Sequence, residues 1–341
     1  MSAAPNAAER RSGAVGWWAA FGAIGIAVGL ETWVRWIASS DFTKPGPGPD
    51  HYGSMTYLTI FEIASCTAAA LFLWRIVVRP WIRERRVPLD GKILVGLTLS
   101  YFVDPVLNLY SPTFAMNAHS LSFGSWANQL PFYTAPHQGR FAEGLLWAPE
   151  LYMYFGLLAA IAGCWLLDRM RARFPRASTA TLFTVLFAIF VCADFPAEWL
   201  AIVRPQIYVF AGVPKDFSLF AGKLYQFPIY QSLFAAVFAT MITWLRDSKD
   251  ADGRTAVERG LDTLSISNAR KGPLSFLAVT GFMLASVLGY FLPYSWAAAS
   301  ADTYVRLPSY LSTAAYCGTA TKPLCPSQTV ASHTTTRSPH R

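Results

Sequence analysis

The amino-acid sequence predicts an all-α integral membrane protein with about seven transmembrane helices, a cytoplasmic N-terminus and a long external lid between the third and fourth helices. Hydrophobic residues make up 53% of the 341 residues and charged residues only 14%, whereas a soluble domain carries about 25% charge. The apolar residues fall in long runs, and the basic residues cluster in alternate connections between those runs. These observations exclude a soluble globule, a disordered chain and a nucleic-acid partner for the net charge of +8.

Seven stretches are long enough to cross a bilayer, which takes about 20 mostly apolar residues. The first of them is far longer than the apolar core of a signal peptide, so we expect it to be retained. The seven stretches are residues 14–38, 54–78, 92–111, 144–167, 178–203, 224–245 and 274–297.

Lysine and arginine residues set the expected orientation, because cytoplasmic connections carry an excess of them. The second, fourth and sixth connections are rich in these residues, and the first, third and fifth connections hold few. The even connections are therefore predicted to be cytoplasmic. This places the N-terminus inside and the C-terminus outside.

Three regions follow from the composition. Residues 1–13 are expected to be a disordered N-terminus, 14–297 the seven-helix transmembrane domain, and 298–341 an external, largely disordered tail rich in Ala, Ser, Thr and Pro. Cys317 and Cys325 lie in that tail. The sequence is compatible both with a disulfide between them and with two free thiols.

Acidic side chains inside the predicted spans give the strongest functional signal, because an ionised carboxylate near mid-bilayer costs about 2.5–3.5 kcal/mol. The topology puts four of them, from four helices, in the outer half of the membrane: Glu62, Asp104, Glu150 and Asp194. We predict one polar cavity, open toward the outer side and bounded by the second to sixth helices. The alternative is that each acid is structural, paired with an arginine near the interface or neutral and hydrogen-bonded.

Prolines accompany the acids that we rank first as catalytic residues. Pro105 follows Asp104, and Pro196 lies two residues after Asp194. Each proline removes a backbone hydrogen bond, which a membrane tolerates where a helix lines a cavity or is buried in protein. Glu150 and then Glu62 follow as further catalytic candidates.

Polar residues that share a helical face with these acids, or lie beside them, are candidates for substrate binding. They are Tyr101 and Asn108 near Asp104, Tyr154 near Glu150, Glu198 near Asp194, and Gln226 with Gln231 on the sixth helix.

The connection from 112 to 143 is too long for a plain turn. It is rich in amide, hydroxyl and aromatic side chains and has almost no charge, which suits a lid over a hydroxylated, partly apolar molecule. Asn117, His119 and Trp126 are its candidate substrate-binding residues. The alternative is an ordinary interfacial loop with aromatic anchors.

The sequence lacks the residues that several classes of cofactor-dependent membrane protein require. The five histidines form no cluster of the di-iron type and none lies within a predicted span, and the last helix lacks the lysine of a microbial rhodopsin. We find no phosphate loop, dinucleotide fingerprint, nucleophile elbow or metal motif. An enzyme built on this chain is therefore expected to transfer protons with acids, amides and phenols, without a cofactor or a metal.

Three segments carry a resemblance to a known family: RPWIRERRVPLDGKIL (79–94), YFVDPVLNLYSPTFAMNAHSLSFGSW (101–126) and AGKLYQFPIYQ (221–231). They resemble the AveC-like spirocyclases, membrane proteins of avermectin, milbemycin and meilingmycin biosynthesis, over about residues 50–295. The resemblance implies conversion of a dihydroxy-ketone polyketide or macrolide precursor to a 6,6-spiroketal and, in some members, dehydration of the spiroketal ring. It implies a small-molecule substrate and a multi-pass protein of the cell membrane.

A second class of function uses the same carboxylates. A proton-coupled transporter or lipid-binding membrane protein would also place acids within the bilayer. An inverted repeat would favour transport, and the sequence shows none. A cyclase acting by acid/base catalysis is the preferred prediction.

Overall fold

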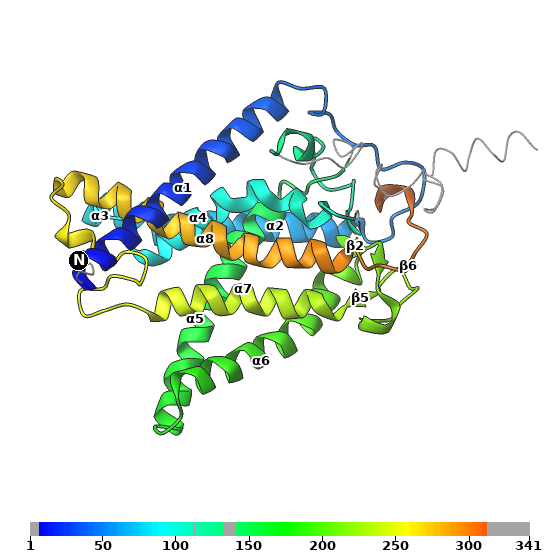
Figure 1. The fold of residues 1–341 in the computed structure, drawn as a ribbon. Helices are drawn as coiled ribbons and strands as arrows, with labels where there is room; N and C mark the ends of the chain where they lie inside the picture. The colour runs from blue at the N-terminus through cyan, green and yellow to red at the C-terminus, as the bar shows by residue number, and fades with distance from the viewer. Residues whose placement is uncertain (1–6, 112, 132–140, 312–341) are drawn as a thin grey trace, which may run out of the picture.

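The computed structural model describes residues 7–111, 113–131 and 141–311, and these residues form a mostly helical bundle (Figure 1). The α-helices are α1 (Ala7–Ile37), α2 (Met55–Phe72), α3 (Arg79–Glu84), α4 (Leu89–Ser100), α5 (Ala148–Arg173), α6 (Thr179–Glu198), α7 (Ile229–Asp247) and α8 (Asn268–Ala298). A π-helical segment, η1 (Leu73–Val78), joins α2 to α3, and another, η5 (Trp199–Val203), extends α6.

Each of the seven apolar stretches is helical over most of its length. Five helical segments are both long and apolar enough to cross a membrane, namely Ala14–Ile37, Met55–Glu84, Ala148–Arg173, Thr179–Val203 and Asn268–Ala298. The other two stretches hold α4, of 12 residues, and α7, of 19 residues with Gln231 and Ser232 among its buried side chains. The protein is therefore helical with five candidate spans, and seven spans remain a prediction.

The third stretch differs from the expected continuous α-helix. After Ser100 the chain tightens into a 3₁₀-helix, η2 (Tyr101–Asn108), which contains Pro105. A proline inside an α-helix lacks the N–H for the ladder and clashes with the carbonyl four residues earlier. The change of geometry places Asp104 in a buried segment rather than in a regular transmembrane turn.

Helices α1 and α8 cross at close range because both carry glycine at the crossing point. A methyl group on Gly22 would lie 2.1 Å from the carbonyl oxygen of Leu277, and one on Gly281 would lie 2.1 Å from that of Trp18. Small residues allow the backbones of membrane helices to approach each other in this way.

The six strands are short and pair antiparallel. β1 (Phe114–Met116) pairs with β2 (Tyr208–Phe210), with Phe114 opposite Phe210. β3 (Gly212–Val213) pairs with β6 (Thr303–Tyr304), and β4 (Ser218–Leu219) with β5 (Phe227–Pro228). The strands thus tie the third and fifth connections, and the chain after α8, to one another.

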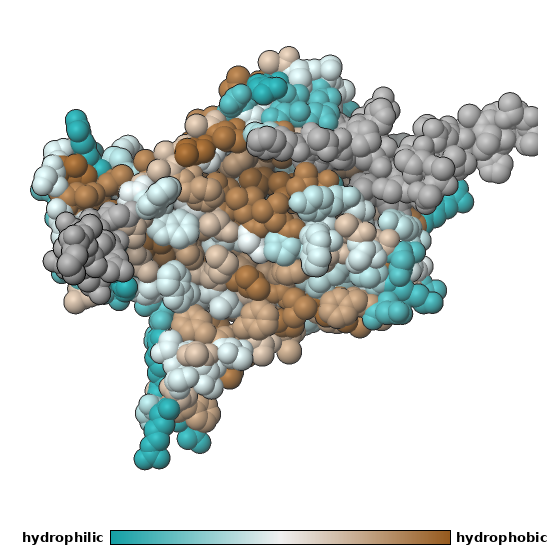
Figure 2. All heavy atoms as spheres, in the orientation of Figure 1, coloured by the Kyte–Doolittle hydropathy of each residue, from teal (hydrophilic) through white to brown (hydrophobic). Residues whose placement is uncertain are grey.

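The connections alternate between the two ends of the bundle (Figure 1). The strands gather at one end, called here the strand end; α3, the α5–α6 connection and residues 248–267 lie toward the other, called the basic end. Figure 2 shows hydrophobic residues over the middle of one face and hydrophilic residues at the α5–α6 connection and near β5 and β6. Placing the basic end in the cytoplasm remains a prediction.

The expected lid and tail are partly within the described residues. Most side chains of 113–131 and 141–147 are buried, among them Trp126 and Trp147 at 1% exposure. After α8, Leu307 and Leu311 are buried against the strand end. Cys317 and Cys325 lie outside the described residues, as do the ends 1–6 and 312–341.

Candidate active site

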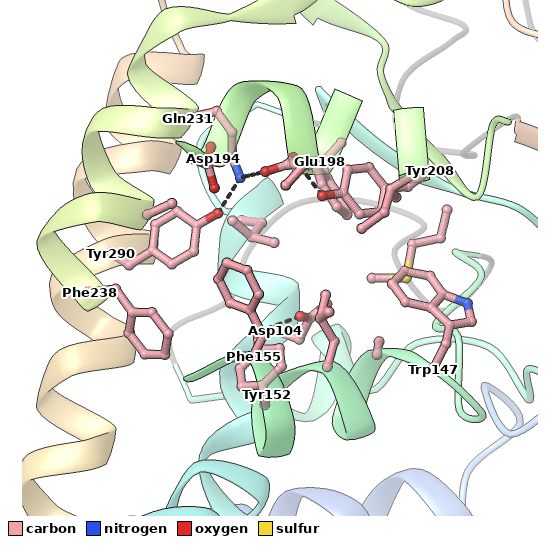
Figure 3. A pocket seen from close by; sticks show the side chains of 18 of the residues that line it. Asp104, Trp147, Tyr152, Phe155, Asp194, Glu198, Tyr208, Gln231, Phe238 and Tyr290 are labelled. Carbon is pink, nitrogen blue, oxygen red and sulfur yellow. Dashed lines mark hydrogen bonds between the residues drawn. The ribbon is translucent and has the colours of Figure 1, made fainter. Parts of the chain in front are cut away.

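A cavity of about 290 Å³ lies within the bundle near the strand end (Figure 3). Aromatic and aliphatic side chains form most of its wall. The second to sixth predicted helices all contribute, as expected, and α8 does so as well, through Val287, Tyr290 and Phe291. Its polar lining residues are Asp104, Tyr152, Tyr154, Asp194, Glu198, Tyr208, Gln231 and Tyr290.

One wall of the cavity carries two carboxyl groups from α6. Asp194 and Glu198 are four residues apart and so share a helical face. Ser232 Oγ donates a hydrogen bond of 2.8 Å to Asp194 Oδ2. Glu198 accepts at both oxygens: from the Tyr208 hydroxyl at 2.5 Å and from Gln231 Nε2 at 2.7 Å.

Gln231 extends this wall to α8. Its Nε2 group, which has two hydrogens to donate, also lies 2.5 Å from the Tyr290 hydroxyl. Its Oε1 is buried and has no hydrogen-bond partner among the described residues. Figure 3 shows Gln231, Asp194 and Glu198 together on one side, with Tyr290 beside them.

The facing wall carries Asp104 (Figure 3). Asp104 is 4% exposed, and its Oδ1 accepts a 2.6 Å hydrogen bond from the Tyr152 hydroxyl of α5. The 3₁₀-helix η2 positions this carboxyl group. At the end of η2, Asn108 donates a hydrogen bond to the carbonyl of Phe114 and so positions the chain that follows. The cavity therefore separates the Asp104 carboxyl from the two carboxyl groups of α6.

Glu143 is a second carboxyl group behind Asp104, and the sequence analysis missed it. It is 3% exposed, and its Oε1 accepts a 2.8 Å hydrogen bond from Ser125 Oγ. Glu143 and Asp104 line a small hollow that shares Leu107 with the main cavity. Burial, and then the charge of Asp104, raise the pKa of Glu143 well above its usual value.

A signal for Glu143 was present in the sequence. Glu143 lies one residue before the expected start of the fourth helix, on the loop side, and so outside the predicted spans. An acid in a connection normally reaches water. Here the connection itself is folded into the protein, so the same residue is buried.

The ion pairs of the described residues do not include the acids of this site. Within residues 7–111, 113–131 and 141–311, they involve none of Asp104, Glu143, Asp194 and Glu198. Hydroxyl and amide groups donate hydrogen bonds to these acids instead. Among the described residues, Asp104 and Asp194 therefore have no arginine partner, and the other structural alternative, a neutral hydrogen-bonded acid, stays open.

Glu62 and Glu150 do not line the cavity, contrary to the prediction of one convergent set. Both are half-buried. Glu62 Oε1 accepts the backbone N–H of Leu121 at 3.1 Å. Cys66 Sγ of α2 lies 3.9 Å from Glu150 Oε1. The shared depth inferred from the sequence says nothing of the direction in which each side chain points around its helix, and these two point elsewhere.

Tyr154 bridges these two regions. It lines the cavity, and its hydroxyl lies 3.1 Å from Ser65 Oγ on α2. Of the predicted substrate-binding residues, Tyr154, Glu198 and Gln231 line the cavity.

Four other predicted substrate-binding residues form hydrogen bonds with backbone groups. Asn108 bonds both the N–H and the carbonyl of Phe114, at 2.9 Å each. The remaining three donate to carbonyl oxygens: Asn117 to Gln206 at 2.9 Å, Trp126 to Phe102 at 2.6 Å, and Gln226 to Phe210 at 2.8 Å. A polar residue in a buried loop satisfies that loop first, because unpaired buried backbone groups are costly.

Tyr101 and His119 also lie away from the cavity lining. The Tyr101 ring packs on Tyr152 at 5.3 Å, and its hydroxyl has no partner among the described residues. The His119 ring stacks on Tyr52 at 5.5 Å. Burial, and then Lys44, lower the pKa of His119. His119 therefore does not reach over the acids as expected.

Three phenols of the cavity, Tyr152, Tyr208 and Tyr290, were not predicted from the sequence. Tyr290 lies on α8, and Tyr208 lies on β2 in the fifth connection. Across the described part of the chain, no group of three His, Cys, Asp or Glu residues could hold a metal ion. The site offers carboxyl and phenol groups in an apolar wall, a set suited to proton transfer.

A comparison with protein families finds one match: residues 84–316 fit the family model described as "Spirocyclase AveC-like". That range contains Asp104, Glu143, Asp194 and Glu198. No curated protein and no solved structure matched the chain.

Proposed function

The chain belongs to the AveC-like spirocyclase family, and we propose that it closes a dihydroxy-ketone polyketide or macrolide precursor to a 6,6-spiroketal without a cofactor. We place it in the cell membrane as a multi-pass protein of seven spans with a cytoplasmic N-terminus. The observation that carries the proposal is the pair of facing walls around an apolar cavity, each with buried carboxyl groups that pair with no cation among the described residues.

Spiroketal formation joins two hydroxyl groups to one carbonyl carbon and releases one water. The first hydroxyl oxygen bonds to that carbon and loses its proton, while the carbonyl oxygen gains one, which gives a hemiketal. The hemiketal hydroxyl then gains a proton, its C–O bond breaks, and the departure of water gives an oxocarbenium-like cation. The second hydroxyl bonds to the cation and gives up its proton. No electron is gained or lost, so acids and bases suffice.

We assign the acid role to Asp194. Both oxygens of Glu198 accept hydrogen bonds, which favours the ionised form of Glu198. Two carboxyl groups one helical turn apart in an apolar wall do not both ionise readily, so we assign the proton that the pair keeps to Asp194. Asp194 can then protonate the carbonyl oxygen. After it regains the proton that the first hydroxyl released, it can protonate the departing hydroxyl, and the proton of the second hydroxyl restores the starting state.

We assign the base role to Asp104 on the facing wall. The Tyr152 hydroxyl donates to it, which favours its ionised form. Burial and the charge of Asp104 raise the pKa of Glu143 beside it, which favours the protonated form of Glu143. An ionised Asp104 can accept the proton of the attacking hydroxyl and stabilise the cation that forms between the walls.

The apolar wall supports the same reaction. Trp147, Phe238 and Phe291 line the cavity and exclude bulk water, which would otherwise capture the cation. A folded polyketide held between the two walls would also close with one configuration at the spiro carbon. The uncatalysed reaction in solution gives a mixture of epimers.

Stereochemistry therefore provides the test. Membranes containing the protein are incubated with a dihydroxy ketone that has a hydroxyl on the fourth carbon to either side of the carbonyl and a stereocentre on each arm. We expect faster closure and one spiroketal epimer. Membranes with the Asp104→Asn/Asp194→Asn variant are the control. An epimer ratio equal to that of membranes without the protein contradicts the proposal, and the mass of the product reports any ring dehydration.

A further inference from the structure

The cavity lining differs in exposure according to the part of the chain from which it comes. The lining residues of the connections are all buried: Phe114, Met116, Trp147 and Tyr208. The exposed lining residues are Phe155 of α5, at 40%, and Ala197 of α6. The cavity therefore reaches the surface between two membrane-spanning candidates and is closed toward the strand end, where the sequence analysis expected it to open.

Among the described residues, helices α5 and α6 each form hydrogen bonds with α7 and none with each other. Thr243 of α7 donates to Ala159 of α5 at 3.5 Å, and Ser232 of α7 donates to Asp194 of α6 at 2.8 Å. None of the hydrogen bonds found in the described segments links α5 directly to α6. Helix α7 thus forms a common back wall, and the opposite side of the pair is left open.

The two helices meet near their connection and diverge from it (Figure 1). Leu167 of α5 packs there with Leu182 and Leu186 of α6 in a small apolar cluster separate from the main core. Phe155 lies 18 residues before Arg173, the last residue of α5, and Ala197 lies 18 residues after Thr179, the first residue of α6. At about 1.5 Å per residue both stand at a similar distance from the connection.

Helix α2 completes the frame of the opening. Phe61 of α2 and Ala201 of η5 are half-buried lining residues. Toward the strand end the Tyr57 hydroxyl of α2 donates a 2.8 Å hydrogen bond to the carbonyl of Ala201. This bond joins α2 to η5, the extension of α6, and closes the frame on that side.

We propose that the opening framed by Phe61, Phe155, Ala197 and Ala201, called here the lipid mouth, admits the dihydroxy ketone sideways from the bilayer, with Ala197 limiting its passage. This rests on the proposed function and adds to it the physical class of the substrate: an apolar, membrane-dissolved molecule that carries its hydroxyl groups into the cavity. All four residues that frame the lipid mouth are apolar. Such a frame presents no barrier to an alkyl chain and binds no headgroup.

Substitutions in an entry passage and substitutions in the wall of the binding cavity should change binding kinetics differently. Narrowing a passage slows arrival and departure alike and leaves the equilibrium affinity unchanged, whereas filling the binding cavity weakens affinity, mostly through faster dissociation. Ala197→Phe narrows the mouth, and Ala197→Leu does so less. Ala193→Phe is the matched control, since Ala193 is exposed one turn earlier on α6 and does not line the cavity.

The probe is an unreactive brominated dialkyl spiroketal in proteoliposomes, followed by quenching of tryptophan fluorescence, since Trp147 lies in the cavity wall. We expect Ala197→Phe to lower both rate constants by about tenfold with a nearly unchanged Kd, Ala197→Leu to fall between, and Ala193→Phe to match the wild type. Unchanged rates in both Ala197 variants, or a weaker Kd with unchanged association, would overturn the proposal.

Turnover separates this proposal from the function on which it rests. If the wild type binds the probe with the expected mouth kinetics but yields no stereoselective spiroketal, the proposed function fails and the mouth stands. If the wild type yields one epimer but the Ala197 variants bind and release the probe at the wild-type rates, the proposed function stands and the lipid mouth is contradicted. A loss of protein yield in Ala197→Phe leaves Ala197→Leu as the deciding variant, because its side chain is smaller.

Discussion

Carboxyl groups at the basic end and those around the cavity are stabilised in different ways. At the basic end three buried or half-buried acids each pair with a cation: Glu258 with Lys92 at 2.7 Å, Asp90 with Arg246 at 2.9 Å, and Asp247 with Arg171 at 2.6 Å. Around the cavity the acids accept hydrogen bonds from phenols, a hydroxyl and an amide. A carboxylate held by a cation is fixed in one protonation state, whereas a carboxyl group held by neutral partners can exchange a proton.

Glu258 illustrates the first arrangement. Its Oε2 accepts from the backbone N–H and the hydroxyl of Thr255, and Ser275 donates to its Oε1. Burial alone would raise the pKa of Glu258, but Lys92 and these hydrogen bonds outweigh burial and hold that pKa below its usual value. The group joins residues 248–267 to α4 and α8, so its contribution is to stability.

The largest effect is expected from removing a proton-transferring carboxyl of the cavity. A positioned acid or base contributes about 10²–10⁴-fold to a rate, so Asp104→Asn and Asp194→Asn should each lower stereoselective turnover by about that factor. Asparagine keeps the volume, so folding and membrane insertion should survive. Turnover per folded molecule is the measurement. Near-normal values for both variants would mean that these acids are structural.

The next effect separates the basic end from the cavity. Glu258→Gln leaves Lys92 without its charge partner and should destabilise the protein by about 3 kcal/mol, as found when one member of a buried pair is removed. Thermal unfolding in detergent near neutral pH measures it. Since the pKa of Glu258 is lowered, the difference from wild type should shrink as pH falls through that lowered pKa.

A matched control for that substitution lies on the surface. Glu84 pairs with Arg86 at 2.8 Å, with both side chains more than half exposed. Glu84→Gln should change stability by less than about 1 kcal/mol. An equal loss in the two variants would contradict the difference drawn between buried and exposed pairs, and turnover per folded molecule should be unchanged in both.

A smaller effect is expected at the two acids that the structure places outside the cavity. Glu62→Gln and Glu150→Gln should alter turnover by less than about tenfold, because neither side chain lines the cavity and so neither exchanges a proton with the substrate there. The same stereochemical assay measures this. A loss as large as that of Asp104→Asn in either variant would restore the four-acid site expected from the sequence.

Position along the bundle could be predicted from the sequence better than direction around it. Each of the seven apolar runs contains a helix, and the depth of Asp104 and Asp194 within their runs pointed to residues that line one cavity. Glu62 shares that depth and points elsewhere. Depth depends only on counting residues from an interface, whereas direction depends on packing between helices that are distant in sequence.

The connections were the least predictable part. Their amide and hydroxyl side chains indicated a ligand-binding lid, yet Asn117 donates a hydrogen bond to a backbone carbonyl of a buried loop. Composition cannot distinguish these two uses of an amide, because both require the same donors and acceptors. For the same reason Glu143, in a connection, escaped a search limited to spans.

The smallest effect on turnover at neutral pH is expected from substitution of Glu143. The contribution of Glu143 should instead appear in how the stability of the protein depends on pH. A group whose pKa is raised on folding holds a proton that the unfolded chain has lost, so stability falls as pH rises from the usual pKa of glutamate toward the raised value. Glu143→Gln is neutral throughout and lacks this fall. The unfolding temperature of the variant relative to wild type should therefore increase between about pH 5 and pH 8, on the order of a few degrees. Its amide can still donate to Asp104, so neutral turnover should change less than about tenfold. A variant that is destabilised equally at both pH values, or that loses turnover as Asp104→Asn does, would mean that Glu143 is ionised and serves as a base itself.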